Sequence, residues 1–373
     1  MGTQPRVAIV GGGPAGAVAA LVLARRGVPV VVLEAHAAPA LKVGETLPPG
    51  ILPLLQHLDL QRRLESDGHL RSQGNRSVWG SDEPGERSFL ADPYGEGWHV
   101  DRRRFEARLA EAAREAGAEW RWGCRLESCD AMDGGWRLAI AGEAPERLDV
   151  ELVADATGRP ARLARRLGAR RLRYDRLVGI AGLLASASPA ADTYTLVEAT
   201  PEGWWYSALL ADGRLAVAFL GDGDLLERPL LNARESSSAW WERLAQTAAT
   251  RERVEAHGYH LNSPLRPLPA ESSRLDVIAG EGWLALGDAA AAYDPLSSHG
   301  IASAMGSGFY GGHALADLLE GRDEAPLAYL HVMQQAYGAY LDLLREHYAA
   351  ERRWPDAPFW RRRHSPGFCL EPF

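Results

Sequence analysis

Apolar residues near the start of the chain form two short runs on either side of a longer one. Arg6 to Val10 and Pro29 to Glu34 are short, almost continuously apolar runs, a pattern typical of buried strands. The segment Pro14 to Arg26 between them carries an apolar face and starts with proline, which is favoured in the first turn of a helix. These three segments predict one strand-helix-strand unit.

The next hundred residues alternate between short helical and strand-like patterns. A short helix is predicted over Ile51 to Leu60, and short strands and loops between Ser72 and His99. Asp101 is a residue type that caps helix starts, so a helix is predicted from there to about Ala116.

The rest of the chain predicts a second sheet and a helical end. Strand-like runs between Glu119 and Asp155 and between Tyr174 and Phe219 predict an antiparallel sheet. The segment Val277 to Asp288 resembles the first strand-helix-strand unit and is assigned to the same domain. Helices are predicted after it over Gly300 to Leu319 and Ala325 to Arg353. The fold class is α/β. We predict one discontinuous domain over 1–75, 100–168 and 270–322, a second over 76–99 and 169–269, and a C-terminal helical segment over 323–373.

A glycine motif lies where the first strand meets the first helix. Gly11, Gly13 and Gly16 form G-x-G-x-x-G, with Ala15 inside it, and Glu34 ends the second strand. Glycines at this spacing permit a tight turn and close approach of backbone N–H groups to a pyrophosphate, while the acid binds a ribose hydroxyl. The context predicts a dinucleotide site. A second match to the motif, Gly306, Gly308 and Gly311, lies inside a predicted helix and is interpreted as close helix packing.

Composition excludes several other classes of protein. The chain has 46% hydrophobic and 24% charged residues and a net charge of −8, which favours a folded protein and argues against nucleic-acid binding. Its three cysteines lack metal-ligand spacing, so no metal site is predicted. No apolar run approaches the roughly 20 residues of a membrane span, and no signal peptide is evident. We therefore expect a cytoplasmic protein.

Further motifs give the chain a family resemblance. Gly44-Glu45-Thr46, Asp101-Arg102, Asp155 to Arg159, Gly287-Asp288 and Asp294-Pro295-Leu296 follow one another in the order found in FAD-dependent monooxygenases and halogenases, which the chain resembles. The resemblance implies a glutathione-reductase-type Rossmann domain that binds FAD, interleaved with an antiparallel-sheet substrate domain. It also implies FAD contacts from the following residues: Ala15, Glu45, Arg102, Gly287, Asp288, Pro295, Gly300 and Ile301.

The predicted helix start at Gly300 has a chemical consequence of its own. Its N–H groups and positive dipole end would stabilise negative charge on a reduced flavin. His299 is a candidate proton carrier there, although a structural histidine is the more common case, and Ser297 lies in the same loop. We take Ser297, His299 and Gly300 as the candidate catalytic residues. Because the chain has only one credible dinucleotide-binding motif, no separate NAD(P)H-binding domain is predicted. The electrons are therefore expected from NAD(P)H that binds transiently, or from a separate flavin reductase.

Two branches of the family resemble the chain to different degrees. Gly203 to Tyr206 is similar to a strand motif of tryptophan halogenases, yet Lys42 is the last lysine, and Ser297 occupies the position of the halogenase glutamate. The chain more closely resembles flavoproteins that mature cysteine tryptophylquinone enzymes, including the partners of lysine ε-oxidase and glycine oxidase quinoproteins. Gly74 to Gly80, Gly97 to His99 and Glu351 to Pro355 carry this resemblance.

That resemblance implies an FAD-dependent monooxygenase that hydroxylates an aromatic side chain, tryptophan in the first place. The substrate would then be an aromatic group in a quinoprotein precursor polypeptide. A reductase of a small or prenyl-like substrate, a halogenase and a non-catalytic flavoprotein chaperone remain alternatives. Five aromatic residues are predicted to line the substrate pocket, although core packing is an equally ordinary role for each: Trp79, Trp98, Trp204, Trp205 and Tyr206.

Overall fold

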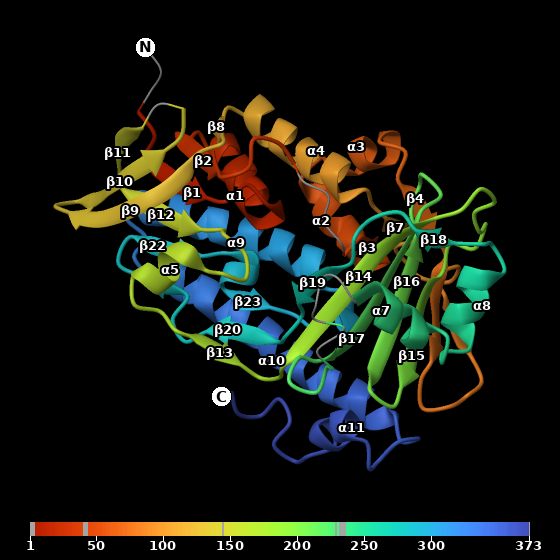
Figure 1. Cartoon of the computed structure of the whole chain (residues 1–373). Coiled ribbons are helices and arrows are strands. Elements are labelled where there is room, and N and C mark those ends of the chain that lie inside the picture. Colours follow the sequence, from red (N-terminus) through yellow and green to blue (C-terminus); the bar gives the residue numbers. More distant parts are fainter. Residues whose placement is uncertain (1–3, 40–43, 144, 228–229, 231–235, 373) are drawn as a thin grey trace.

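The computed structural model describes residues 4–39, 44–143, 145–227, 230 and 236–372. Two large sheets dominate this part of the chain (Figure 1). The first has the strand order β21 (Ala279–Gly280), β22 (Trp283–Ala285), β12 (Leu152–Asp155), β1 (Val7–Val10), β2 (Val30–Glu34) and β8 (Glu119–Trp122). All neighbours pair in parallel except β21 with β22.

The parallel sheet is the predicted Rossmann unit. Every residue of β1 and β12 is buried, as expected for central parallel strands covered on both faces. Helix α1 (Pro14–Arg25) follows β1 and packs against α4 (Arg102–Glu115) and α9 (Gly300–Leu319). The carboxylate of Asp101 caps α4 by accepting from the backbone N–H groups of Arg103 and Arg104, so the predicted cap is confirmed.

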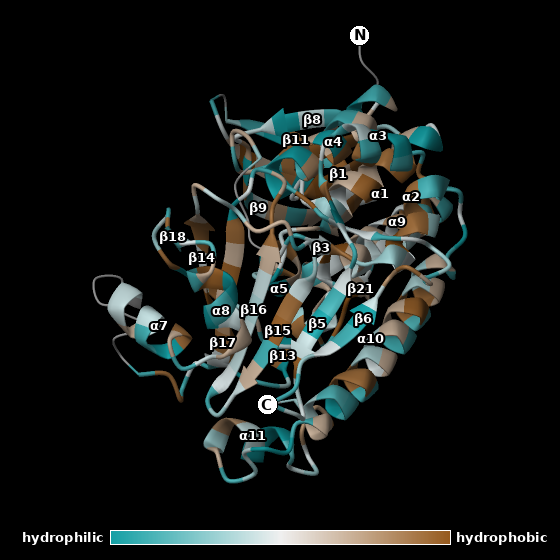
Figure 2. Ribbon diagram, turned by 90° about the vertical axis from the view of Figure 1, so that its right-hand side faces the viewer, coloured by the Kyte–Doolittle hydropathy of each residue, from teal (hydrophilic) through white to brown (hydrophobic). Residues whose placement is uncertain are grey.

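The second sheet is largely antiparallel and separates two apolar clusters. Its order is β18 (His260–Leu261), β14 (Leu177–Ala185), β17 (Leu215–Asp222), β16 (Gly203–Leu209), β15 (Thr195–Thr200), β5 (Gly74–Val78) and β6 (Gly85–Ser88), with β19 (Arg266–Pro269) also on β14. One face joins the main core, whereas the other packs against α7 (Ser236–Leu244) and α8 (Ala249–Glu255). Figure 2 shows α7 and α8 outside this sheet and α10 on its other side.

The strand runs between Glu119 and Asp155 divide between two sheets, which corrects the sequence prediction. The outer runs are β8 and β12 of the parallel sheet, and only the middle of the segment is antiparallel. It forms a separate three-stranded sheet of β9 (Arg125–Met132), β10 (Gly135–Ala141) and β11 (Glu146–Val150). Short apolar runs look alike in both kinds of sheet, so the sequence pattern alone does not identify their partners.

Smaller elements connect the two large sheets. Two further three-stranded sheets are β3 (Thr46–Leu47), β7 (Gly97–His99) and β4 (Leu70–Ser72), and β13 (Arg171–Arg173), β20 (Ser273–Leu275) and β23 (Ala291–Ala292). The remaining helices are η1 (Pro49–Ile51), α2 (Leu52–His57), α3 (Gln61–Ser66), α5 (Arg162–Arg166), η2 (Gly287–Ala289), η3 (Pro295–Ser297), α10 (Ala325–Ala350) and α11 (Pro358–Arg363). The parallel strands fall within 1–75, 100–168 and 270–322, and the domain division itself stays a prediction.

Helix α10 runs from the parallel-sheet half to the base of the antiparallel sheet (Figure 1). Its buried positions recur every three or four residues, which places them on one face: Ala325, Tyr329, Met333, Tyr337, Tyr340, Leu344 and Tyr348. This face carries four tyrosines whose hydroxyl groups form hydrogen bonds to the body of the protein. Among the described residues, no helix combines the length and apolar character needed to cross a membrane.

Candidate functional site

Two of the three motif glycines are required by the protein itself, and the third leaves room for a ligand. A Cβ atom on Gly11 would lie 2.2 Å from the Ala156 carbonyl oxygen, and one on Gly16 would lie 2.0 Å from the Gly11 oxygen. A Cβ atom on Gly13 would meet no heavy atom within 4 Å. Gly13 precedes α1, whose first N–H groups lack partners within the helix. The open space at this helix start suits a pyrophosphate.

The Glu34 carboxylate lies beside this helix start. One oxygen accepts from the Gly12 N–H (2.7 Å), and the other accepts from the His36 N–H (2.8 Å). Burial opposes ionisation of Glu34, but the hydrogen bonds from His36 and Gly12 outweigh it and hold its pKa below the usual value. Glu34 also borders a small recess with Gly12, His36, Ala38, Pro39, Glu106 and Trp122. An ionised acceptor at such a recess suits a ribose hydroxyl.

The N-terminus of α9 extends beyond the N-terminus of α1 and forms a second helix start. Ala15 of α1 packs on Gly308 of α9, and Ala19 packs on Gly312, so the two helices run parallel. Gly308 allows no Cβ atom, because one would lie 2.2 Å from the Ala15 carbonyl oxygen. A Cβ atom on Gly311 would meet the Leu286 side chain (2.3 Å), and one on Gly306 would meet nothing within 4 Å. The interpretation of this second motif as helix packing is therefore confirmed at Gly308. Helix α9 begins at Gly300, which places its first turn about 12 Å beyond the contact at Gly308.

The segment before α9 forms an exposed loop. Pro295, His299 and Gly300 are exposed, and a Cβ atom on Gly300 would meet nothing within 4 Å. Ser298 adopts a left-handed conformation (φ 53°), which is uncommon for a residue with a side chain and marks this loop as strained. Nearby protein atoms partly desolvate the His299 ring, and this effect, together with the nearby His347, lowers the His299 pKa. The neutral ring therefore predominates at neutral pH.

The other predicted cofactor residues adjoin these helix starts. Gly287 has a positive φ of 57° and lies against Ala15 and Ala304, while the half-exposed Asp288 carboxylate is 3.8 Å from the Arg159 guanidinium. Arg102 donates to the Gly44 carbonyl oxygen (2.8 Å) and to Glu106 (2.6 Å). Arg102 thus anchors the Gly44-Glu45 segment to α4, and its contact with FAD stays a prediction. Ile301 is buried in the first turn of α9.

Glu45 is a buried carboxyl group tied to the antiparallel sheet. Its oxygens accept from the Tyr206 hydroxyl (2.9 Å) and from the Gly44 N–H (2.7 Å). Burial raises the Glu45 pKa. The Tyr206 hydroxyl also forms a hydrogen bond with Thr46 (2.8 Å). In this arrangement Glu45 fixes the Gly44-Glu45 segment to strand β16.

The five predicted aromatic residues do not form one lining, which corrects that expectation. Trp204 is fully buried, and its ring lies 6.5 Å from that of Trp79. Tyr206 shares a face of β16 with Trp204, whereas Trp205 points to the opposite face and packs against Phe219 and Trp240 of the second apolar cluster. Trp98 is buried on β7 beneath the Arg71 guanidinium. Trp79, Trp204 and Tyr206 remain as candidate substrate-side residues.

Sequence analysis missed a buried polar cluster beside Tyr206. His99 forms hydrogen bonds through one ring nitrogen to Thr195 (2.9 Å) and through the other to the Leu209 carbonyl oxygen (2.9 Å). Burial lowers the His99 pKa to about 4, so the ring stays neutral. The partners come from strands distant in sequence, which no local pattern reveals. The available signal was the segment Gly97 to His99, which contributes to the family resemblance.

Asp294, predicted only as part of a motif, is a buried carboxyl group at the start of the loop before α9. It is 1% exposed, and its carboxylate accepts from the Leu296 N–H (2.8 Å) and the Tyr348 hydroxyl (2.7 Å). Burial, assisted by the nearby Asp175 carboxylate, raises the Asp294 pKa to about 7. Arg363 on α11 acts in the opposite direction and favours the charged form.

The raised pKa of Asp294 predicts how stability changes with pH. The folded protein holds this proton up to about pH 7, whereas an unfolded chain releases it near pH 3.9. The contribution of Asp294 is therefore fully present below about pH 4 and is lost as the pH rises toward 7. Relative to Asp294→Asn, we expect the free energy of unfolding of the wild type to fall across this range. Urea unfolding at several pH values measures the difference, and a constant or rising difference would contradict the prediction.

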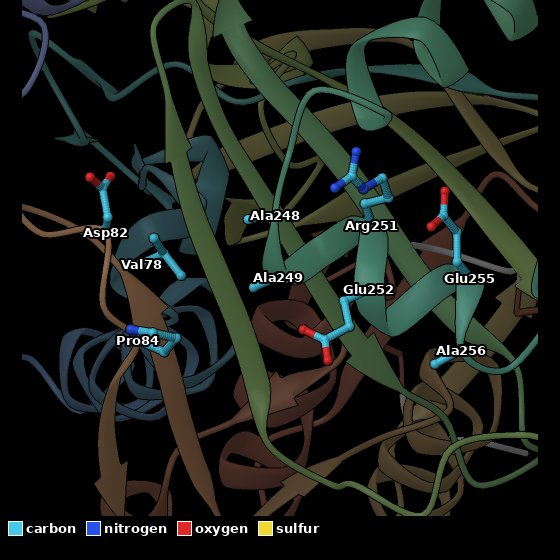
Figure 3. Close-up of a pocket in the computed structure, with 9 residues that line it drawn as sticks. All are labelled: Val78, Asp82, Pro84, Ala248, Ala249, Arg251, Glu252, Glu255 and Ala256. Carbon is cyan, nitrogen blue, oxygen red and sulfur yellow. The ribbon is translucent and has the colours of Figure 1, made fainter.

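A hollow of about 730 Å³ lies apart from these residues. It is formed by the end of β5, the following turn and α8, and is lined by Val78, Asp82, Pro84, Ala248, Ala249, Arg251, Glu252, Glu255 and Ala256 (Figure 3). None of the predicted site residues lines it. Within the described part of the chain, no group of three or more His, Cys, Asp or Glu side chains is arranged to hold a metal ion.

Comparisons with known proteins identify the family and the cofactor. Residues 4–331 match the family described as FAD binding domain. A protein described as an FAD-dependent oxidoreductase, LodB of Marinomonas mediterranea, is 29% identical over 362 residues, which cover 96% of each chain. The chain therefore belongs to the FAD-binding domain family, and its cofactor is FAD.

Solved structures confirm the fold. The flavin-dependent halogenase CmlS is similar with a TM-score of 0.87 and 26% identity, covering 99% of this chain and 70% of CmlS. QhpG, described as a peptidyl tryptophan dihydroxylase essential for tryptophylquinone cofactor biogenesis, is similar with a TM-score of 0.80 and 24% identity, covering 98% of this chain and 79% of QhpG. The α/β fold with a Rossmann unit and C-terminal helices is thus the halogenase-type flavoprotein fold. Both oxygenating and halogenating enzymes use it.

Proposed function

We propose that the protein is an FAD-dependent monooxygenase that hydroxylates a tryptophan side chain of a partner polypeptide. The observation that carries the proposal is the chemistry of the loop before α9. By the family resemblance, Ser297 stands where halogenases have a glutamate, and its hydroxyl donates to the Asp294 carbonyl oxygen (2.8 Å) within the loop. The chain has no lysine after Lys42 to hold a halogenating species. The likeness to QhpG supports a tryptophan substrate.

The residues of the chain have distinct tasks in this proposal. The N-terminus of α1 with Gly13 binds the pyrophosphate, and Glu34 binds a ribose. When bound and reduced, FAD supplies the electron pair that activates O₂. One oxygen atom is inserted into the aromatic C–H bond and the other leaves as water. The two electrons and one proton come from NAD(P)H as a hydride, directly or through a flavin reductase, and the second proton comes from solvent.

The N-terminus of α9 contributes electrostatics to the same reaction. Its first N–H groups and the positive end of the helix dipole stabilise negative charge that develops in front of Gly300. The neutral His299 ring at this start can accept a proton there. Trp79 and Tyr206 lie on the substrate-sheet side and are partly exposed, so their rings can orient an incoming indole, while the buried Trp204 packs against Trp79.

The expected product is a partner polypeptide heavier by one or two oxygen atoms. The assay incubates the FAD-loaded protein with a candidate quinoprotein precursor, reductant and O₂, with and without excess chloride or bromide, and measures the mass of the partner. We expect a gain of oxygen that does not depend on halide, because residues 294–300 include no glutamate and the chain has no lysine after Lys42.

Other outcomes identify the alternatives. Halogen in the main product would show a halogenase, for which the likeness to CmlS is the supporting observation. Loss of a double bond from a small or prenyl-like substrate without O₂ would show a reductase. Binding of the partner with no change in mass, under every condition, would show a flavoprotein that only docks it. An anaerobic reaction is the matched control for the oxygen-dependent result.

A further inference from the structure

We propose that Tyr348 and Asp294 are positioning residues that fix the loop of residues 294–300 to strand β16 of the antiparallel sheet. The loop carries the helix start at which the flavin ring is proposed to bind. The strand carries Trp204 and Tyr206, the candidate substrate-side residues. The inference rests on FAD lying against this loop, as proposed above, and is independent of which reaction the flavin performs.

Asp294 organises the loop from its first residue. Its carboxylate caps η3 through the Leu296 N–H (2.8 Å), and its carbonyl oxygen accepts from the Ser297 N–H (3.1 Å) and hydroxyl (2.8 Å). Its own N–H donates to the Tyr340 hydroxyl (2.7 Å). These bonds hold the turn that leads into the left-handed Ser298. A strained residue persists only where its surroundings fix it, and Asp294 supplies that constraint.

Tyr348 joins Asp294 to the antiparallel sheet. Its hydroxyl donates to the free side of the Asp294 carboxylate (2.7 Å) and accepts from the Trp204 indole N–H (3.0 Å). All three side chains are at most 1% exposed, so water cannot replace either bond. Removing the hydroxyl would leave a buried donor and a buried acceptor without this partner, which is costly for the arrangement.

Strand β16 makes a second link to the proposed flavin site. Tyr206, two residues after Trp204 and on the same face, donates to Glu45 of the Gly44-Glu45 segment (2.9 Å). Alternate residues of one strand therefore hold both segments that the family resemblance places at FAD. A shift of β16 on the substrate side moves both segments, so the geometry couples the substrate sheet to the flavin environment.

Tyr348→Phe tests the link, because it removes the bridging hydroxyl and keeps the ring. The readout is the reduction potential of FAD in the loaded enzyme, measured by spectroelectrochemistry with dithionite, together with the visible circular dichroism of the flavin. A loosened α9 start stabilises the reduced, negatively charged flavin less. We expect about a tenfold lower ratio of reduced to oxidised flavin at a given potential, equivalent to a potential about 30 mV more negative.

Tyr337→Phe is the matched control. Tyr337 lies on the same face of α10 and is 3% exposed, but its hydroxyl makes a single long bond (3.4 Å) to the Ala292 carbonyl oxygen. This variant should keep the potential and the flavin spectrum of the wild type. An unchanged potential in folded, FAD-loaded Tyr348→Phe, or an equal shift in Tyr337→Phe, would overturn the proposal.

Asp294→Asn gives the same test if Tyr348→Phe does not fold, since it keeps the shape of the side chain while weakening the acceptor. A shift of the same sign supports the proposal, and an unchanged potential overturns it. Neither variant depends on the partner polypeptide. A protein that proves to be a halogenase would still show the shift, so failure of the monooxygenase proposal and failure of this one are distinguishable.

Discussion

Gly13→Val is expected to abolish FAD binding and leave the fold intact. A Cβ atom at this position meets no protein atom within 4 Å, so the side chain enters only the space in front of α1. That space is where the pyrophosphate would approach the N–H groups, so the branched side chain displaces it. Purified wild type should be yellow, and the variant should be colourless with unchanged far-ultraviolet circular dichroism. FAD titration followed by fluorescence measures the loss.

Gly16→Val is the informative comparison, because its side chain points into the protein. A Cβ atom there would lie 2.0 Å from the Gly11 oxygen, so this variant should lose the fold together with FAD. If Gly13→Val retained FAD at wild-type affinity, the cofactor would not lie at the start of α1. If it unfolded, the space in front of the helix would be occupied by the protein rather than by a ligand.

Arg363→Met is expected to lower the free energy of unfolding by about 3 to 5 kcal/mol, the usual cost of removing one partner of a buried ion pair. Arg363 is 3% exposed and binds Asp222 through both terminal nitrogens (2.8 and 3.1 Å). Its guanidinium carbon also lies 3.4 Å from the centre of the Phe359 ring and 4.8 Å from that of Tyr348. Urea unfolding measures the change.

The neighbouring Arg362 provides a control with the same charge. Its side chain is 40% exposed and reaches Asp222 (3.0 Å) and Asp224 (2.7 Å). Exposed ion pairs contribute about 0 to 1 kcal/mol, so Arg362→Met should have a small effect. Equal losses in the two variants would contradict the assignment of Arg363 as the buried member. Loss of Arg363 should also raise the pKa of Asp294 further, because its charge favours the ionised form.

Sequence patterns predicted the elements with local signals well. The helix over Gly300 to Leu319 has the predicted bounds, and the first helix ends one residue early. Proline at the start, glycine spacing and the Asp101 cap are all properties of a few adjacent residues. The unit that carries the glycine motif was predictable for the same reason, because its strand, turn and helix follow one another directly.

Contacts between distant segments could not be predicted in this way. Tyr348 meets Asp294 across 54 positions and Trp204 across 144, and no pattern within any one segment records these partners. One error was avoidable. Trp204 and Trp205 are adjacent in a predicted strand, and successive side chains of a strand point to opposite faces, so both cannot line one pocket. The alternation of side chains between the two faces of a strand was sufficient to predict that Trp204 and Trp205 point in opposite directions.

The sheet order has a consequence for how the protein is made. Strand β1 and helix α1 are synthesised first, but β1 pairs with β12, β12 with β22, and α1 packs on α9, whose residues extend to Leu319. At about 5 to 20 residues per second, roughly 15 to 60 s of translation separate the first of these elements from the last. During that interval α1 lacks the neighbour that covers Ala15. We therefore expect FAD to be captured only after synthesis has passed Leu319, because α9 is complete only then.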